Sequence, residues 1–170
     1  MRRLAWICIG AVFLGCVALA YAIPHRYPVP TDVALILAGK CDVPVTLRAI
    51  EHIHETNKGM PALHGYAEVG KVELSAPAAS VALSKGVSAV NPEERGLRLT
   101  RGGKLCAFDP HHAVSFTRSG HSYDVIICFS CGELLVYRDG WRLSGVWDFT
   151  GHPHNLNHAL AESTRVLNPL

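Results

Sequence analysis

The second half of the chain, from residue 112 onward, alternates between apolar and polar residues with a period of two. Its segments AVSFTR, SYDVIICF, LLVYR and WRLSGVW are rich in the β-branched and aromatic residues that favour strands. A Ser-Gly pair at 119–120 and an Asp-Gly pair at 139–140 separate neighbouring segments, and both pairs are typical of tight hairpins. The pattern predicts a four-strand antiparallel meander over about residues 113–148, with a further turn near Gly132.

The first half of the chain mixes helix and strand signals. Apolar positions at Val45, Leu47, Ile50 and Ile53 predict a short amphipathic helix within residues 43–59. The later segments predict a strand over 64–75, a helix over 76–88 that begins after Ser75, a hairpin over 97–108, and a closing helix over 152–167. Strict strand–helix alternation is absent, so the expected class is α+β, with helices packed on one face of a mainly antiparallel, four- to five-stranded meander.

The N-terminal segment has the pattern of an export signal. Two arginines precede residues 4–23, which contain no charged side chain. The segment fits a signal peptide cut after a small-x-small site, an uncleaved membrane anchor, or a lipoprotein signal with its acceptor at Cys16. Each alternative places the rest of the chain outside the cytoplasm, as a periplasmic, secreted or membrane-anchored protein. Residues 24–30 are a Pro-rich tether, and residues 31–170 are long enough for a single domain.

Charge excludes one class of partner. Without Arg2 and Arg3, the count of lysines and arginines falls from 16 to 14 and equals the 14 aspartates and glutamates. Nucleic-acid binding depends on a basic surplus or patch, so we expect no nucleic-acid partner. A membrane is an expected partner only through the N-terminal segment, if that segment is not cleaved.

Four of the six cysteines lie in the expected domain, at Cys41, Cys106, Cys128 and Cys131. An even number of cysteines outside the cytoplasm favours disulfides, and four cysteines allow three complete pairings. Pairing about the turn at 119–120 brings the residues near Asp109 level with the end of the next strand. We therefore predict that Cys106 lies near the Cys128-x-x-Cys131 motif and that at least one cysteine of that motif joins it in a disulfide or a metal site.

The C-x-x-C-G form of this motif is also typical of zinc knuckles, with Gly132 as the permissive residue after the second cysteine. A zinc site would use Cys106, His111, Cys128 and Cys131, and zinc is the cofactor that this set fits. A thioredoxin-like reaction would need a helix that begins at the motif, whereas the residues after it predict a strand. Separate buried thiols are a further alternative, since cysteine packs like a small apolar residue.

The sequence contains no recognisable catalytic constellation, so whether the protein is an enzyme stays open. G-x-S-x-G, H-E-x-x-H, phosphate-loop and dinucleotide-binding motifs are all missing. The expected function is a binding or structural module. The alternative is an extracytoplasmic metal- or thiol-dependent protein that uses Cys106, Cys128, Cys131 and His111.

The segments CAFDPHHAVSFTRSG and YDVIICFSCGELLVY together resemble a group of uncharacterised exported bacterial proteins. Those proteins carry a Cys-Phe, Pro, His segment, followed by a hydrophobic strand that ends in Cys-Phe-x-Cys. The resemblance covers about residues 106–140, and here Ala107 separates Cys106 from Phe108. It implies a genuine domain and an association of the three cysteines, and it implies no reaction.

Overall fold

The computed structural model describes residues 28–92 and 107–167. The expected export segment at 1–23, most of the tether and nearly all of the expected hairpin at 97–108 lie outside the described residues. Within the described residues, no helix combines the length and apolar character that crossing a bilayer requires.

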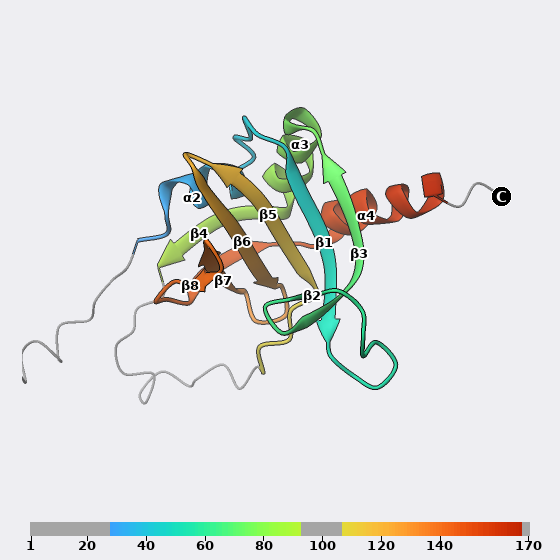
Figure 1. Cartoon of the computed structure of the whole chain (residues 1–170). Helices are drawn as coiled ribbons and strands as arrows, with labels where there is room; N and C mark the ends of the chain where they lie inside the picture. The colour runs from blue at the N-terminus through green and yellow to red at the C-terminus, as the bar shows by residue number, and fades with distance from the viewer. Residues whose placement is uncertain (1–27, 93–106, 168–170) are drawn as a thin grey trace, which may run out of the picture. The chain divides into compact units, whose positions relative to one another are not determined.

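The described residues form an α+β domain with a mainly antiparallel sheet, as expected (Figure 1). The sheet has the strand order β2-β3-β1-β5-β6-β7-β9-β4, and β8 pairs with β7. The expected four to five strands are too few, because β1, β2, β3 and β4 join the strands of the meander in one sheet. The elements are α2 (Thr31–Leu37), β1 (Val45–His52), β2 (Ala62–Leu63), β3 (Tyr66–Leu74), α3 (Ala76–Gly86), β4 (Val87–Pro92), β5 (His112–Arg118), β6 (His121–Cys128), β7 (Glu133–Arg138), β8 (Trp141–Arg142), β9 (Trp147–Gly151) and α4 (His154–Leu167).

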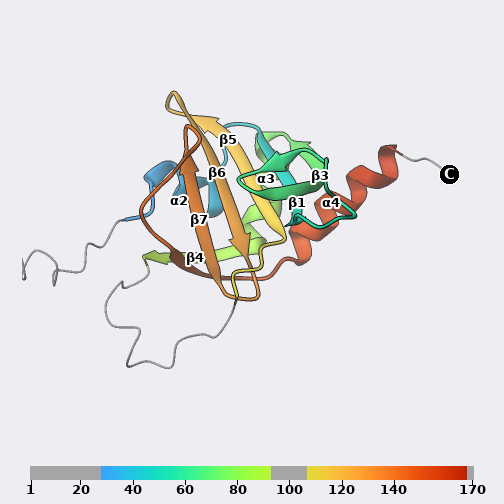
Figure 2. The ribbon, with the colours of Figure 1, turned by 60° about the horizontal axis from the view of Figure 1, so that its bottom comes forward.

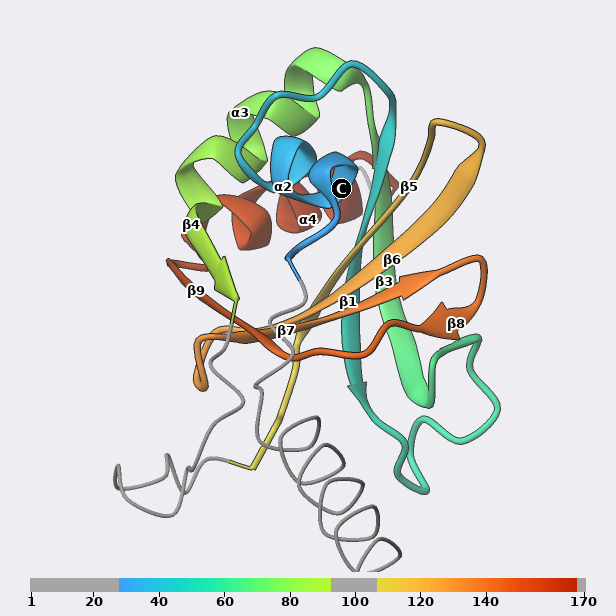
Figure 3. The ribbon, with the colours of Figure 1, turned by 90° about the vertical axis from the view of Figure 1, so that its left-hand side faces the viewer.

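The three helices of the described residues share one face of the sheet, which curls around them (Figure 3). Ile36 of α2, Leu83 of α3 and Leu156 of α4 are buried in the same cluster as the inward side chains of the strands. Trp147 is the largest fully buried side chain of this core. On the opposite face a smaller apolar cluster forms around Ile126, beneath residues near the β2–β3 turn. This division leaves part of the outer face uncovered.

The predicted meander is present in its central part. Strands β5, β6 and β7 follow one another as antiparallel neighbours, and Figure 2 shows them side by side. The chain turns at Gly120, Gly132 and Gly140, all of which have positive φ. The fourth segment splits into the short β8 and the longer β9, which also pairs with β4.

The predicted helix within residues 43–59 is wrong, since Val45–His52 forms strand β1. Val45 and Leu47 alternate in a strand pattern and face the helices. Ile50 comes three residues after Leu47, so the same alternation points its buried side chain to the other face of the sheet. The change of face lengthens the apolar spacing from two residues to three, and this spacing imitates a helix in the sequence.

The predicted strand over 64–75 and the predicted helix over 76–88 are confirmed. Strand β3 and helix α3 lie within the expected ranges, although the Ser75 side chain makes no capping hydrogen bond. Helix α2 was not expected from the sequence. It ends in a Schellman motif, in which the Gly39 amide donates to the Ile36 carbonyl and the Lys40 amide donates to the Leu35 carbonyl, both at 2.9 Å.

Helix α4 is joined to the sheet by His112, the first residue of β5. Its Nε2 lies 2.6 Å from Oδ1 of Asn157, and its ring meets the Phe129 ring edge-on. Nδ1 is buried and has no hydrogen-bond partner in the described part of the chain. Burial lowers the pKa of His112, the Asn157 hydrogen bond opposes this shift, and His111 adds to it. The folded protein therefore favours neutral His112.

This burial makes the stability of the domain depend on pH. Above pH ~6.5 the imidazole is neutral in both the folded and the unfolded states, and it contributes no pH dependence. Below that pH the unfolded chain binds a proton more readily than the folded chain, so stability falls. We expect the free energy of unfolding to drop between pH 6.5 and 5.5 through this residue, by at most about 1 kcal/mol. Urea unfolding at both pH values should show a smaller drop for His112→Gln, and an equal drop in both proteins would contradict the assignment.

Candidate functional site

Polar side chains form a row across the uncovered part of the outer face. In the strand register Glu73 faces Thr46, Thr46 faces Ser115, and Ser115 faces Asp124. Directly opposite residues on paired strands point to the same face, so the row crosses β3, β1, β5 and β6 at one level. These residues alternate with the inward Val45, Phe116 and Tyr123 of the core.

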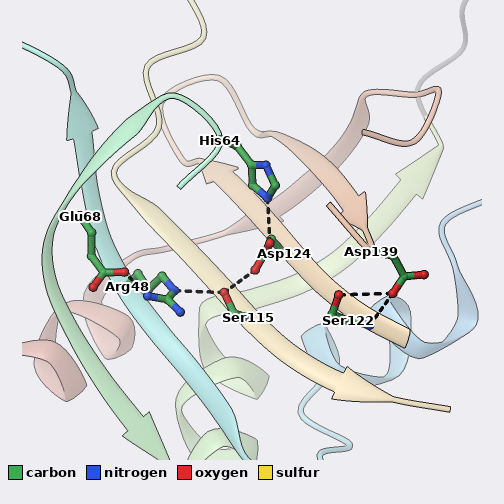
Figure 4. Close-up of polar contacts among 7 residues, drawn as sticks. All are labelled: Arg48, His64, Glu68, Ser115, Ser122, Asp124 and Asp139. Atoms are coloured by element: carbon green, nitrogen blue, oxygen red, sulfur yellow. Dashed lines mark hydrogen bonds and ion pairs between the residues drawn. The ribbon is translucent and has the colours of Figure 1, made fainter. Parts of the chain in front are cut away.

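Asp124 is the centre of a hydrogen-bonded network on this row (Figure 4). The Ser115 hydroxyl donates to Oδ1 of Asp124 at 2.6 Å, and Nε2 of His64 lies 2.7 Å from Oδ2. Nε of Arg48 donates to the Ser115 hydroxyl at 3.1 Å, and Nη1 of Arg48 pairs with Glu68. The network fixes the direction of the Asp124 carboxylate before any ligand is bound.

His64 reaches Asp124 from the turn between β2 and β3. The turn places His64 at φ 49° and Gly65 at φ 90°. The imidazole stacks on the Tyr137 ring, with 3.6 Å between centroids and 11° between planes. Stacking and the Asp124 contact together hold the turn against β6 and β7.

Ser115, Asp124 and His64 do not form a nucleophilic triad. In such a triad the histidine lies between the serine and the carboxylate, and accepts the serine proton. Here the carboxylate lies between the other two groups, and the serine hydroxyl donates to it. The arrangement orients a carboxylate, and it does not activate Ser115.

A groove of about 380 Å³ lies along the polar row. Its polar lining consists of the carboxylates of Glu73 and Asp124 and the side chains of Thr46, Ser115, Thr117 and Ser122. No lysine, arginine or histidine of the described segments lines it. Asp124 is only partly covered, with a side-chain exposure of 24 %. The groove thus offers hydrogen-bond acceptors and negative charge.

The Cys128-x-x-Cys131 motif lies in the turn between β6 and β7. Cys128 is a fully buried free thiol whose Sγ lies 3.3 Å from the Asp109 carbonyl oxygen. Sγ of Cys131 lies 3.3 Å from the carbonyl oxygen of Ala107. Strand β7 begins two residues after the motif, as expected, and no helix begins there. The motif therefore packs against the segment that follows Cys106.

The remaining predicted site residues are Cys106, His111 and Cys41. Cys106 lies outside the described residues. Nε2 of His111 lies 3.5 Å from Asp109 on an exposed side chain, and Cys41 is a free thiol whose amide bonds to Ser80 on α3. Burial raises the pKa of Cys41. Across residues 28–92 and 107–167, no group of three histidine, cysteine or acidic side chains is placed to hold a metal ion.

Sequence reasoning did not single out the polar row or its network. A signal for part of the row was present, since Ser115 and Thr117, and Ser122 and Asp124, occupy alternate positions on either side of the hairpin turn. Such polar positions are also expected on any solvated sheet face. His64 and Arg48 have no comparable signal in the sequence. The β2–β3 turn brings His64 to Asp124, and the pairing of β1 with β5 brings Arg48 to Ser115.

The chain matches no family model, no curated protein and no solved structure. The function proposed below therefore rests on the geometry of the described residues and on the chemistry of their side chains.

Proposed function

We propose that the chain is an exported or membrane-tethered bacterial binding module whose outer-face groove takes a small ligand bearing an ammonium group and hydroxyl groups. The observation that carries the proposal is the oriented Asp124 carboxylate in a groove lined by hydroxyl side chains. Export is the expectation from the N-terminal segment, and it is part of the proposal.

The lining determines the ligand class. A carboxylate can accept about four hydrogen bonds, and Ser115 and His64 account for two of those at Asp124. The unused acceptor positions and the Glu73 carboxylate favour a ligand that donates hydrogen bonds and carries positive charge. Hydroxyl side chains both donate and accept, which suits a ligand with several hydroxyl groups. An anionic ligand would meet two carboxylates without a cation in the lining.

Burial supports binding over thiol chemistry. A reactive thiol has to reach its substrate, and Cys128 has no exposed surface. Asp124 and the hydroxyl side chains border open volume instead.

Backbone NMR titration with D-glucosamine tests the proposal. This probe carries an ammonium group and several hydroxyl groups, and we expect shift changes at the amides of β5 and β6 that line the groove. D-glucose lacks the ammonium group and should bind more weakly, and gluconate carries a negative charge and should leave the spectrum unchanged. Asp124→Asn removes the charge at similar volume and should weaken glucosamine binding at least about tenfold, as expected for a lost charge-assisted hydrogen bond.

Asp42→Asn is the matched control, because Asp42 is an exposed carboxylate that pairs with Arg118 outside the groove. This variant should bind glucosamine as the unmodified protein does. Shift changes that are absent, lie outside the groove, or are the same for Asp124→Asn and the unmodified protein would overturn the proposal.

A further inference from the structure

Strand β3 has an open edge over residues 70–74. On one side it pairs with β1 along its length, whereas on the other side β2 pairs only with Tyr66 and Ala67. A further hydrogen bond from the Glu68 amide to the Pro61 carbonyl ends the coverage. No other strand of the described segments lies on this side, and Figure 1 shows β3 next to last in the sheet, beside the short β2. An open edge presents unpaired backbone groups that can pair with another strand.

The side chains of this edge are complementary to themselves. Lys71 and Glu73 are exposed, have opposite charges, and point to the same outer face because they are two residues apart. Gly70, Val72 and Leu74 point to the helix side, where Val72 and Leu74 pack against the core. Two antiparallel copies of the edge that meet at Val72 would place each Lys71 opposite Glu73 of the second copy.

This register is distinguished from its neighbours by charge. Copies centred on Lys71 would oppose two lysines, and copies centred on Glu73 would oppose two glutamates. Copies centred on Gly70 would leave Lys71 opposite Val69. Opposite charges at facing positions stabilise a strand pair and like charges destabilise it, so the Val72-centred register is preferred. In that register Leu74 also faces Gly70, which leaves room for the larger side chain.

An apolar groove lies next to the same edge on the helix side. It has a volume of about 490 Å³, and its apolar lining comes from Val72 and Leu74 of β3, Ala78, Val81 and Ala82 of α3, and Ala159 of α4. Val81 is 63 % exposed and adds apolar surface beside this edge. A second copy paired at β3 would bring a second apolar surface of this kind to the same side.

We propose that two copies of this chain associate through their β3 edges, antiparallel and centred on Val72, to form one continuous sheet. The association buries the open edge, pairs Lys71 with Glu73 in both directions, and places the two apolar grooves on the same side of the joined sheet. The proposal does not rest on the ligand proposed for the outer-face groove, although Glu73 belongs to both surfaces.

Sedimentation velocity of the full chain over a concentration series tests this proposal. We expect a reversible dimer. Lys71→Glu or Glu73→Lys should raise its dissociation constant at least about tenfold, because either change places two pairs of like charges opposite each other across the interface. The double variant Lys71→Glu/Glu73→Lys restores opposite charges and should return the dissociation constant to within about threefold of the original. Lys40→Glu changes an exposed lysine on the loop after α2 and should have no effect.

Far-UV circular dichroism of each variant distinguishes a folding defect, which changes the spectrum, from a loss of association in a folded protein. A protein that stays monomeric over the series would overturn the proposal. The β3 edge would then be free to pair with an extended peptide of another protein. Dimers that resist both single changes, or a double variant that stays as weak as the single variants, would overturn it as well.

Discussion

Replacement of Gly39 by alanine is expected to destabilise the domain by about 3–4 kcal/mol, a large part of the ~5–15 kcal/mol that stabilises a domain of this size. Gly39 has φ +74° in the turn after α2, a conformation that costs an L-residue about 1–2 kcal/mol. A Cβ atom there would also lie 2.5 Å from Cβ of Ser84 and 2.8 Å from the Ser80 carbonyl oxygen. The Ser80 carbonyl belongs to the backbone of α3, so a side-chain rotation cannot remove this clash. The two helices α2 and α3 would have to move apart.

Gly120→Ala is the matched control. Gly120 has φ +78°, nearly the same backbone strain, but a Cβ atom there would meet nothing within 4 Å. We expect this variant to lose only about 1 kcal/mol, which corresponds to the strain alone. Equilibrium unfolding in urea, followed by far-UV circular dichroism, gives both values. Similar losses of stability for the two variants would show that the close approach of α2 and α3 adds nothing to the cost of a side chain at residue 39.

The parts of the fold that local signals determine could be predicted from the sequence. Turn pairs and period-two patterning located β5, β6 and β7, and apolar spacing located α3 and α4. The prediction failed for β1, because Leu47 and Ile50 are buried on opposite faces of the strand, which gives an apolar spacing of three residues. The predicted number of strands was also too small, because β1 and β3 lie far along the chain from the meander that they join. Non-local pairing of this kind leaves no signal in the pattern of a single segment.

The candidate site was less predictable than the fold, for a related reason. Asp124 and Ser115 are close in the hairpin, and their alternation could be read from the sequence. Arg48 and His64 come from distant segments and reach them only through the pairing of β1 with β5 and the stacking of His64 on Tyr137. The cysteine motif, by contrast, is recognisable in the sequence alone. Ala107 contacts Cys131, whereas the closeness of Cys106 itself to the motif stays a prediction.

We expect loss of a Cys106–Cys131 disulfide to destabilise the domain by ~3 kcal/mol, the entropy of a loop of roughly 25 residues. Sγ of Cys131 lies against the carbonyl of Ala107, the residue that follows Cys106. Consecutive Cα atoms are ~3.8 Å apart, and we expect the Cα atom of Cys106 to come within the ~7 Å limit between bridged Cα atoms. Cys128 and Cys41 are free thiols, and the contacts of Cys41 lie on α2 and α3. Of the three possible partners for Cys131, Cys106 is therefore the best placed.

Peptide mapping of unreduced, alkylated protein from an oxidising compartment should recover Cys106 linked to Cys131, with Cys41 and Cys128 alkylated. Cys131→Ser should lower the free energy of unfolding by the same amount as dithiothreitol lowers it in the unmodified protein, because both remove the same covalent constraint from the unfolded chain. Cys41→Ser leaves that constraint in place, so its stability should still fall when dithiothreitol is added. A zinc site would give a different pattern, in which a chelator rather than dithiothreitol destabilises the protein and metal analysis finds one zinc per chain. Alkylation of Cys106 and Cys131 in metal-free protein would exclude both the disulfide and the metal, and would leave the motif as buried thiols that pack as small apolar side chains.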